Sequence, residues 1–296
     1  MNYAVIGASG NTGRCVAEAL LKQGKKVRVI GRTAEKLRPL ARSGAETCVG
    51  PLADKTFLSQ ALEGVGALYA MLPPDMTVPD VRAYYGKLGE SIASAVSKAD
   101  VRYVVALSSQ GADLPARTGP IAGLYDQEQR LNGLKDVHVV HLRAGFFMEN
   151  LLNSIPTIRA QGIVVTPLRG DLPMAMIATR DIGKAAADRL LALDFAGHTV
   201  HDLLGQRDVS MTEATRIIGN AIDRKDLRYV QAPYDQAEQG MIQAGLSAGV
   251  ARTFVEMYRA FNEGLIRFPA RSAQNTTSTR IEEFAGTFAA SFRKPA

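Results

Sequence analysis

Short apolar runs alternate with amphipathic stretches along the first half of the chain. The runs are nearly continuous in Val, Ile, Leu and Ala, which is typical of strands buried on both faces of a parallel sheet. The expected strands are 2–7, 26–32, 45–50, 66–72, 101–109 and 137–145, and the expected helices between them are 15–23, 34–43, 54–62, 81–99 and 124–134. Strict alternation of this kind predicts an α/β fold, with a doubly wound parallel sheet covered by helices on both faces.

The regular alternation ends near residue 145. The elements expected after it are a helix over 146–162, a strand running into a helix over 174–192, a short strand over 198–205 and a mostly helical tail from Met211. We therefore expect a first domain over 1–145 and a smaller, mostly helical lobe over 146–296, some of whose segments return to the first domain. The lobe would supply the second wall of a cleft.

Three glycines follow the first expected strand in the stretch VIGASGNTG. Gly7, Gly10 and Gly13 stand three residues apart, between a strand and a helix. In a Rossmann-type dinucleotide site, the glycines allow a tight turn, close approach of the pyrophosphate, and close packing of helix on strand. Free N–H groups at the helix start, around Asn11 and Thr12, would face the anion. The stretch predicts a bound dinucleotide.

The end of the second expected strand indicates which dinucleotide binds. NAD sites usually carry Asp or Glu about 20 residues beyond the glycines, where the carboxylate binds the ribose hydroxyls. Arg32 takes that place here, and Lys36 follows one helical turn later. A guanidinium binds a 2′-phosphate with two hydrogen bonds, whereas a carboxylate would repel it. We therefore expect NADP(H) in preference to NAD(H).

The charge and composition of the chain indicate which kinds of binding partner to expect. The net charge of +6 comes from basic residues spread along the chain, without a helix-turn-helix, zinc-finger or RNA-binding motif. That charge suits an anionic cofactor rather than direct binding of nucleic acid. No apolar run approaches the ~20 residues of a membrane helix, and no secretory signal is visible. Cys15 and Cys48, the two cysteines, are expected as buried thiols in a reducing, cytoplasmic setting.

Further segments resemble the NmrA-like family of atypical short-chain dehydrogenases/reductases, including its NADPH:quinone oxidoreductase type-2 branch. They run in family order over nearly the whole chain, and the most specific is LRAGFFMEN, of the form L-R-x-x-x-F-x-E-N. The other matching segments are VIGASGNTG, VIGR, LSSQGAD, ATRDIGKAAADRLL, HDLLGQRDVSMTEA and NTTSTRIEEFA. The resemblance implies a Rossmann-type domain, a small helical lobe and a cleft between them.

The resemblance also implies which residues contact cofactor and substrate. The implied cofactor-binding residues are Gly7, Ser9, Gly10, Asn11, Thr12, Gly13, Arg32, Lys36, Leu52, Met71, Leu72, Pro73 and Ser108. Phe146, Phe147 and Asn150 would line a substrate pocket, since an apolar, aromatic wall suits a flat acceptor; an equal alternative is that the phenylalanines only anchor the lobe. Many relatives read adenine with an aspartate after the third strand. Pro51 stands there in this chain, and Asp54 is expected as a helix N-cap.

The catalytic residues of ordinary short-chain dehydrogenases are only partly present. Those enzymes use a serine with Tyr-x-x-x-Lys, in which the lysine lowers the tyrosine pKa. Here Ser108 and Ser109 end the fifth strand and Tyr125 starts the next helix, but Gln129 replaces the lysine. A tyrosine without that lysine titrates near ~10 and stays protonated at neutral pH. Tyr125 and Ser109 are the catalytic candidates, Tyr125 as a mere packing aromatic is the alternative, and Glu128 is expected to pair with a basic neighbour.

The histidines and the remaining motifs indicate no metal site. His138 and His141 lie three apart in an expected strand, as do His198 and His201, and such residues face opposite sides of a sheet. No Ser-His-Asp, CxxC or HExxH motif appears. Two functions follow. The first is an NADPH-dependent oxidoreductase that reduces a quinone or similar carbonyl acceptor, and the second is a non-catalytic NADP(H) redox sensor that acts through a regulatory protein partner.

Overall fold

A seven-stranded parallel sheet forms the centre of the molecule, of which the computed structural model describes residues 1–295. The strand order is β10-β6-β5-β4-β1-β2-β3. The strands are β1 (Asn2–Ile6), β2 (Lys26–Gly31), β3 (Glu46–Val49), β4 (Val65–Ala70), β5 (Tyr103–Ser109), β6 (His138–Ala144) and β10 (His198–Leu203). The predicted doubly wound parallel sheet is confirmed.

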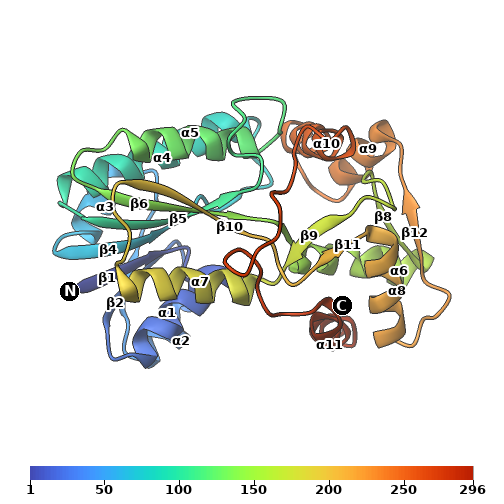
Figure 1. The fold of residues 1–296 in the computed structure, drawn as a ribbon, viewed down its shortest axis with the longest axis horizontal. Coiled ribbons are helices and arrows are strands. Elements are labelled where there is room, and N and C mark those ends of the chain that lie inside the picture. Colours follow the sequence, from blue (N-terminus) through green and yellow to red (C-terminus); the bar gives the residue numbers. More distant parts are fainter. Residues whose placement is uncertain (296) are drawn as a thin grey trace.

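Helices cover both faces of this sheet (Figure 1). One face carries α3 (Lys55–Ala61), α4 (Val81–Lys98) and α5 (Ile121–Asn132), and the other carries α1 (Asn11–Lys22), α2 (Ala34–Arg42) and α7 (Thr179–Ala192). Strand residues alternate between the two cores: Val104 and Ala106 of β5 pack with α4, while Val105 packs with α1 and α7. The helices α1 and α7 approach closely, since a Cβ on Gly183 would lie 2.4 Å from that of Cys15.

The second half of the chain adds two small sheets and further helices, on the right of Figure 1. Its elements are β7 (Phe146–Phe147), the 3₁₀ helix η1 (Met148–Ser154), α6 (Ile155–Gln161), β8 (Ile163–Thr166), β9 (Met174–Ile177), β11 (Asp208–Val209), α8 (Met211–Ala221), β12 (Arg228–Gln231), α9 (Tyr234–Gln243), α10 (Ala248–Asn262) and α11 (Ile281–Phe292). The division of the chain at residue 145 stays a prediction. From the second half, α7 packs on the large sheet and β10 is one of its edge strands.

The single helix expected over 146–162 is wrong. Phe146 and Phe147 form a strand instead, because they pair with Met176 and Ile177 of β9. A 3₁₀ helix and then α6 follow, with Pro156 at the start of α6, where its missing N–H is tolerated. Tertiary pairing therefore outweighs the local helical pattern.

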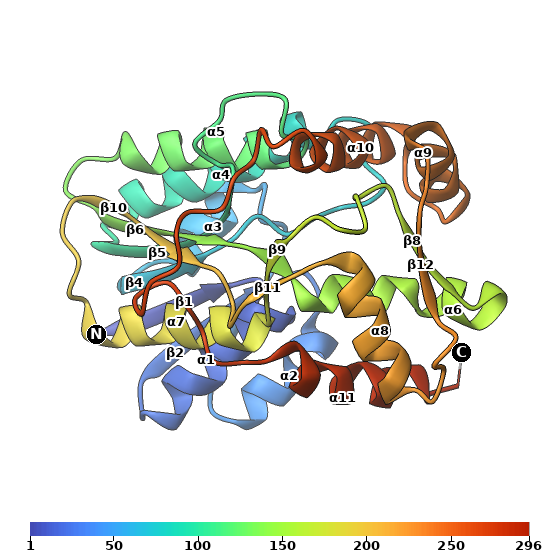
Figure 2. The same cartoon turned by 45° about the vertical axis from the view of Figure 1, so that its right-hand side comes forward.

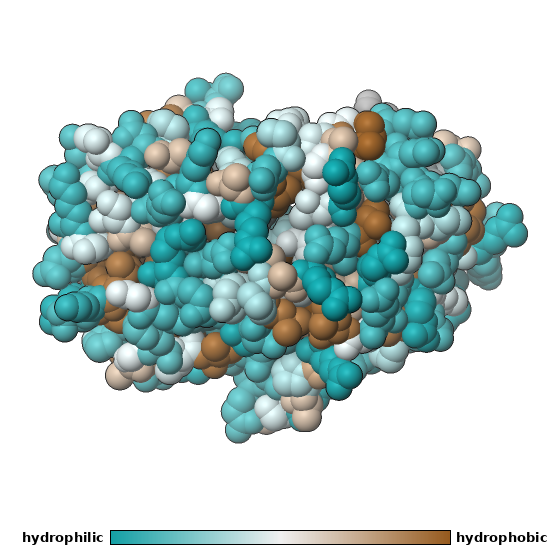
Figure 3. All heavy atoms as spheres, turned by 90° about the horizontal axis from the view of Figure 1, so that it is seen from above, coloured by the Kyte–Doolittle hydropathy of each residue, from teal (hydrophilic) through white to brown (hydrophobic). Residues whose placement is uncertain are grey.

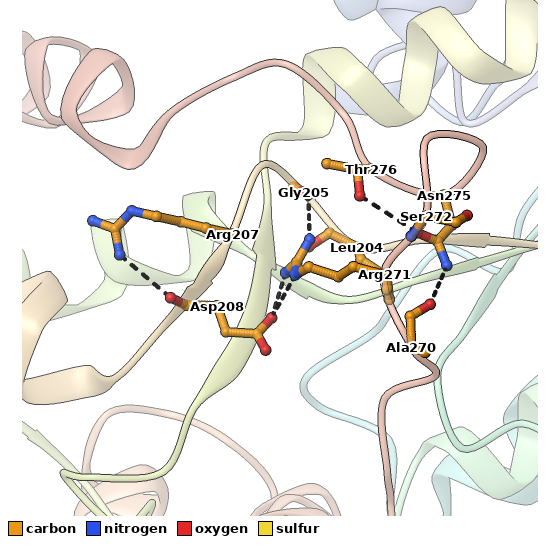
Figure 4. Close-up of polar contacts among 9 residues, drawn as sticks. All are labelled: Leu204, Gly205, Arg207, Asp208, Ala270, Arg271, Ser272, Asn275 and Thr276. Carbon is orange, nitrogen blue, oxygen red and sulfur yellow. Dashed lines mark hydrogen bonds and ion pairs between the residues drawn. The ribbon is translucent and has the colours of Figure 1, made fainter.

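A connecting segment, residues 263–280, runs from α10 past β10 to α11 (Figure 2). Arg271 fastens it, donating to the carbonyl oxygens of Leu204 (3.0 Å) and Gly205 (2.6 Å) and pairing with Asp208 (Figure 4). The N–H of Leu204 in turn donates to the carbonyl of Asn275 at 2.8 Å. The connecting segment therefore links the end of β10 to α10 and α11.

The outer surface is mainly polar on the face that carries α5 and α10. Hydrophilic side chains cover most of it, with smaller hydrophobic patches between them (Figure 3). Within residues 1–295, no helix combines the length and the apolar character that a membrane crossing requires.

Candidate functional site

Most of the predicted site residues follow the carboxyl ends of adjacent parallel strands. Segments that follow such strands lie along one edge of a sheet, and ligands of open α/β folds bind at that edge where the strand order reverses. Here the reversal lies between β1 and β4. The residues at this edge are Gly7 after β1, Arg32 after β2, Leu52 after β3, Met71, Leu72 and Pro73 after β4, Ser108 and Ser109 at the end of β5, and Phe146 and Phe147 after β6.

The glycine turn has the close contacts expected of its spacing. Gly7 has φ +71°, and its carbonyl accepts from the N–H of Gly10 at 2.9 Å. A Cβ on Gly13 would lie 2.4 Å from that carbonyl oxygen, so only glycine lets the helix start so close to the strand. The helix begins at Asn11, directly after the turn and earlier than expected, and no side chain of the described residues caps it. Its first N–H groups remain available to an anion.

Thr12 and Ser9 differ in their surroundings. The hydroxyl of Thr12 is buried and accepts from the hydroxyl of Tyr69 on β4 at 2.9 Å, which anchors the start of α1 to the sheet. Burial raises the pKa of Tyr69, so its hydroxyl stays a donor. Ser9 is half-buried and Asn11 exposed, in the same turn. Thr12 therefore anchors the turn to the sheet through its side chain.

Arg32 and Lys36 are exposed beside the turn. Neither forms an ion pair with another of the residues that the structure describes. Arg32 lies near the loop after β4, where hydrogen bonds from Thr77 lower the pKa of Asp75 and the charge of Arg32 lowers it further. The two basic side chains are therefore free to bind an anion at the carboxyl end of β2.

The segment after β3 contains no carboxylate at the adenine-reading position. Pro51 is exposed and Leu52 is buried. Asp54 accepts from the N–H groups of Thr56 (2.8 Å) and Phe57 (3.0 Å), so its prediction as the N-cap of α3 is confirmed. Its carboxylate is therefore engaged by the helix.

The loop after β4 joins the glycine turn to α10. Met71 packs on the turn, since a Cβ on Gly7 would lie 2.5 Å from its sulfur, while Leu72 is buried and Pro73 half-buried. Farther along, Ser247 at the start of α10 donates its N–H to the carbonyl of Met76 (2.9 Å) and its hydroxyl to that of Val78 (2.5 Å). This loop therefore connects the predicted cofactor site to α10.

A buried polar network lies at the end of β5. The hydroxyl of Ser108 donates to Oε1 of Glu128 on α5 at 2.5 Å. Arg143 of β6 binds the same carboxylate with two hydrogen bonds, Nε to Oε1 at 3.0 Å and a terminal nitrogen to Oε2 at 2.7 Å. Hydrogen bonding to Glu128 raises the pKa of Arg143. The prediction that Glu128 pairs with a basic neighbour is confirmed, and Ser108 is its second partner.

Strand register places this network. Ser108 and Arg143 stand opposite each other on β5 and β6, so their side chains leave the same face of the sheet, the one that α5 covers. The sheet is held together beside them by Gln110, whose side-chain amide donates to the carbonyl of Arg143 (2.6 Å) and to Asp202 of β10 (2.8 Å). The network therefore joins three elements: β5 through Ser108, α5 through Glu128 and β6 through Arg143.

The other catalytic candidates make fewer contacts. Tyr125 is half-buried on α5, one turn before Glu128, and its hydroxyl makes no hydrogen bond within the described chain. Ser109 donates to the carbonyl of Gln110 at 3.0 Å. Gln129, which stands at the position of the lysine in ordinary short-chain dehydrogenases, is exposed. His141 is buried with Nε2 2.8 Å from Asn132, and burial lowers its pKa to about 4, so it is neutral at pH 7.

The LRAGFFMEN segment contains a helix cap that sequence reasoning missed. The carboxylate of Glu149 accepts from the N–H of Thr179 (3.0 Å) and from its hydroxyl (2.6 Å), at the first residue of α7. The signal was the position of Glu149 inside the most specific motif. Phe146 packs on the core that η1, α8 and α11 share, and Phe147 packs on a core of the large sheet. Both are half-buried, while Asn150 is exposed.

Comparisons with known proteins agree with this arrangement. The model of the NmrA-like family matches residues 2–285. The NAD(P)H azoreductase of Xenophilus azovorans is 29% identical over 258 residues, which cover 86% of this chain and 85% of that protein. Two solved structures share the fold: the NADPH-dependent quinone oxidoreductase QOR2 of Escherichia coli complexed with NADPH (TM-score 0.82, 21% identity, 97% and 99% of the two chains) and the triphenylmethane reductase of Citrobacter sp. complexed with NADP(H) (0.80, 19%, 97% and 99%).

Proposed function

The chain belongs to the NmrA-like family, and from that premise we propose that it is an NADPH-dependent oxidoreductase that reduces a quinone or similar carbonyl acceptor. One observation carries the proposal: the uncapped start of α1 at the glycine turn lies one strand away from Arg32, an exposed cation that forms no ion pair among residues 1–295. A pyrophosphate and a 2′-phosphate are the two anions that such a pair fits. The printed names of three similar proteins support a nicotinamide cofactor, given as NAD(P)H for the azoreductase, NADPH for the quinone oxidoreductase and NADP(H) for the triphenylmethane reductase.

The residues present fit NADPH in the following way. The turn from Gly7 to Gly13 and the first N–H groups of α1 would hold the pyrophosphate, and Arg32 with Lys36 would hold the 2′-phosphate. Leu52 and the loop from Met71 to Pro73 would contact the adenosine and ribose parts, leaving the nicotinamide near Ser108. When bound, NADPH supplies a hydride, and the chain then contributes mainly by positioning it.

The proton donors at this edge favour an electron-poor acceptor. The hydrogen of Ser108 is engaged by Glu128, and no lysine accompanies Tyr125. Quinones accept a hydride and form a stabilised anion that water can protonate, whereas simple ketones form an alkoxide that needs a proton in the same step. A site with weak proton donors therefore suits the first class.

The test is oxidation of NADPH by a panel of quinones, quinone-like dyes and simple ketones, followed by the loss of NADPH absorbance. We expect acceptor-dependent oxidation with quinones, slower oxidation with NADH, and none with simple ketones. The enzymatic function would be refuted if the purified, folded protein binds NADPH but none of the acceptors in the panel supports its oxidation.

A second function, a redox sensor that acts through a protein partner, is favoured by Gln129 in place of the lysine. A sensor must bind NADP⁺ and NADPH with different affinity. Calorimetry with the two cofactors tests it: unequal affinity without turnover supports sensing, and equal affinity contradicts it.

A further inference from the structure

We infer that Glu128, held by Arg143, is a positioning residue that makes the Ser108 oxygen a hydrogen-bond acceptor for the carboxamide amino group of the nicotinamide. This inference rests on the proposed NADPH function and adds to it an orientation for the ring. It is carried by the network at the end of β5, in which a serine, a carboxylate and a guanidinium meet.

The carboxylate of Glu128 is buried and paired with a cation. Its side chain is 3% exposed, and an unpaired charge at that depth would be strongly destabilising. Arg143 compensates it with a two-point hydrogen-bonded pair, which fixes the plane of the carboxylate as well as its charge. Glu128 therefore holds one orientation, and Oε1 is the atom it presents to Ser108.

Ser108 has one hydroxyl hydrogen, and that hydrogen is engaged. A hydrogen bond to a carboxylate is stronger than one to a neutral carbonyl, and this one is short, at 2.5 Å. The oxygen keeps two lone pairs, and among the described residues no side chain donates to them. Toward a ligand, Ser108 can therefore only accept.

The position of Ser108 in the fold selects the donor. Ser108 is the last residue but one of β5, which lies two strands from β1, on the side opposite Arg32. With the 2′-phosphate held beyond β2 and the pyrophosphate at β1, an extended dinucleotide places its nicotinamide over β4 and β5. The carboxamide is the part of that ring with N–H donors, so its amino group is the partner that an acceptor at Ser108 fits.

A second ion pair on α5 can be compared with the pair between Glu128 and Arg143. Asp126 pairs with Arg82 of α4 through two hydrogen bonds, at 2.7 and 2.8 Å, on the outer side of α5. That pair joins two helices, and neither of its side chains is bonded to Ser108, Glu128 or Arg143. Asp126→Asn is therefore a matched control that removes an arginine pair from α5 without touching Ser108.

The experiment compares NADP⁺ with its 3-acetylpyridine analogue, whose acetyl group lacks the amino donor. Calorimetry gives the ratio of the two dissociation constants for wild type, Ser108→Ala, Glu128→Gln and Asp126→Asn. A neutral hydrogen bond of about 1 kcal/mol corresponds to about fivefold tighter binding of NADP⁺ by wild type and by Asp126→Asn. The dissociation constant of the analogue divided by that of NADP⁺ should fall to about one in Ser108→Ala. It should also fall in Glu128→Gln, because the new amide can donate to Ser108 instead of accepting from it.

The outcomes separate this inference from the proposed function. If wild type binds NADP⁺ but Ser108→Ala keeps the wild-type ratio, the role assigned to Ser108 and Glu128 is wrong while the cofactor site stands. If wild type binds neither dinucleotide, the proposed function itself fails. Ser108→Ala removes a single oxygen, so the comparison remains decisive even where Glu128→Gln does not fold, and thermal melting identifies that case.

Discussion

Replacing Arg32 with alanine should weaken binding of NADPH far more than binding of NADH. The guanidinium is exposed and has no ion-pair partner in the described chain, so its loss leaves no buried charge and disturbs no packing. Hydrogen bonds to charged groups contribute about 1.5–3 kcal/mol each. Because the site is exposed to solvent, we expect the two hydrogen bonds from the guanidinium to a phosphate to contribute about 1.5–3 kcal/mol together. That free energy corresponds to about a 10- to 100-fold change in the dissociation constant.

The assay is calorimetric titration of wild type and Arg32→Ala with each dinucleotide, at two salt concentrations. The affinity for NADPH should fall by that factor, while the affinity for NADH, which lacks the 2′-phosphate, should stay within about twofold. Higher salt should narrow the NADPH difference, because an exposed charge pair is screened. Arg38→Ala is the control, since Arg38 is an exposed arginine of α2, beyond Lys36, whose weak pair with Glu35 is also at the surface. An equal loss for NADPH and NADH, or no loss for either, would refute the assignment of Arg32 to the 2′-phosphate.

Three further substitutions test other parts of the structure. Gly13→Ala places a Cβ 2.4 Å from a main-chain oxygen of the turn, so thermal melting should show a lower Tm and calorimetry at least tenfold weaker NADPH binding. Gly86→Ala, inside α4 with open space around it, should leave NADPH binding unchanged and should not lower the Tm, because alanine favours a helix more than glycine does. Arg143→Leu leaves the buried Glu128 carboxylate unpaired, and urea unfolding at pH 7 should show a loss of about 3 kcal/mol; a loss below about 0.5 kcal/mol would contradict the pairing. Burial lowers the pKa of His141 to about 4 from ~6.5 in the unfolded chain, so the unfolded state binds the proton first and stability should fall by up to about 3 kcal/mol as pH drops from 6.5 to 4. His141→Gln should remove that part of the acid dependence, and an unchanged acid limb would show that His141 is not its source.

The large sheet and its glycine turn could be predicted because their signals are local. Each buried strand is one continuous apolar run, and the turn needs glycine at positions where a Cβ would collide with main chain or with Met71. Asp54 as the cap of α3 is equally local, since its two acceptor contacts lie two and three residues away. Features of this kind depend on neighbours in the sequence.

The polar network and the small sheets depend on distant partners instead. Ser108 and Glu128 are 20 residues apart, and they meet Arg143 only because β5 and β6 pair in one particular register. The strands β8 and β12 have four residues each, too few to show a period, and each is completed only by the other. The sequence pattern therefore indicated the basic partner of Glu128 by type, while its position followed from the topology.

The path of the chain through the small lobe sets an order for folding. The core of that lobe contains Met148 from η1 and Phe288 from α11, and α11 is reached only after the connecting segment has passed back along β10 (Figure 2). During synthesis the strands from β1 to β6 emerge first, and α7 and β10 then complete one face and one edge of the sheet, because units of an elongating chain fold from the N-terminal side. The lobe has to wait, with Met148 and its neighbours uncovered, until α11 has been made.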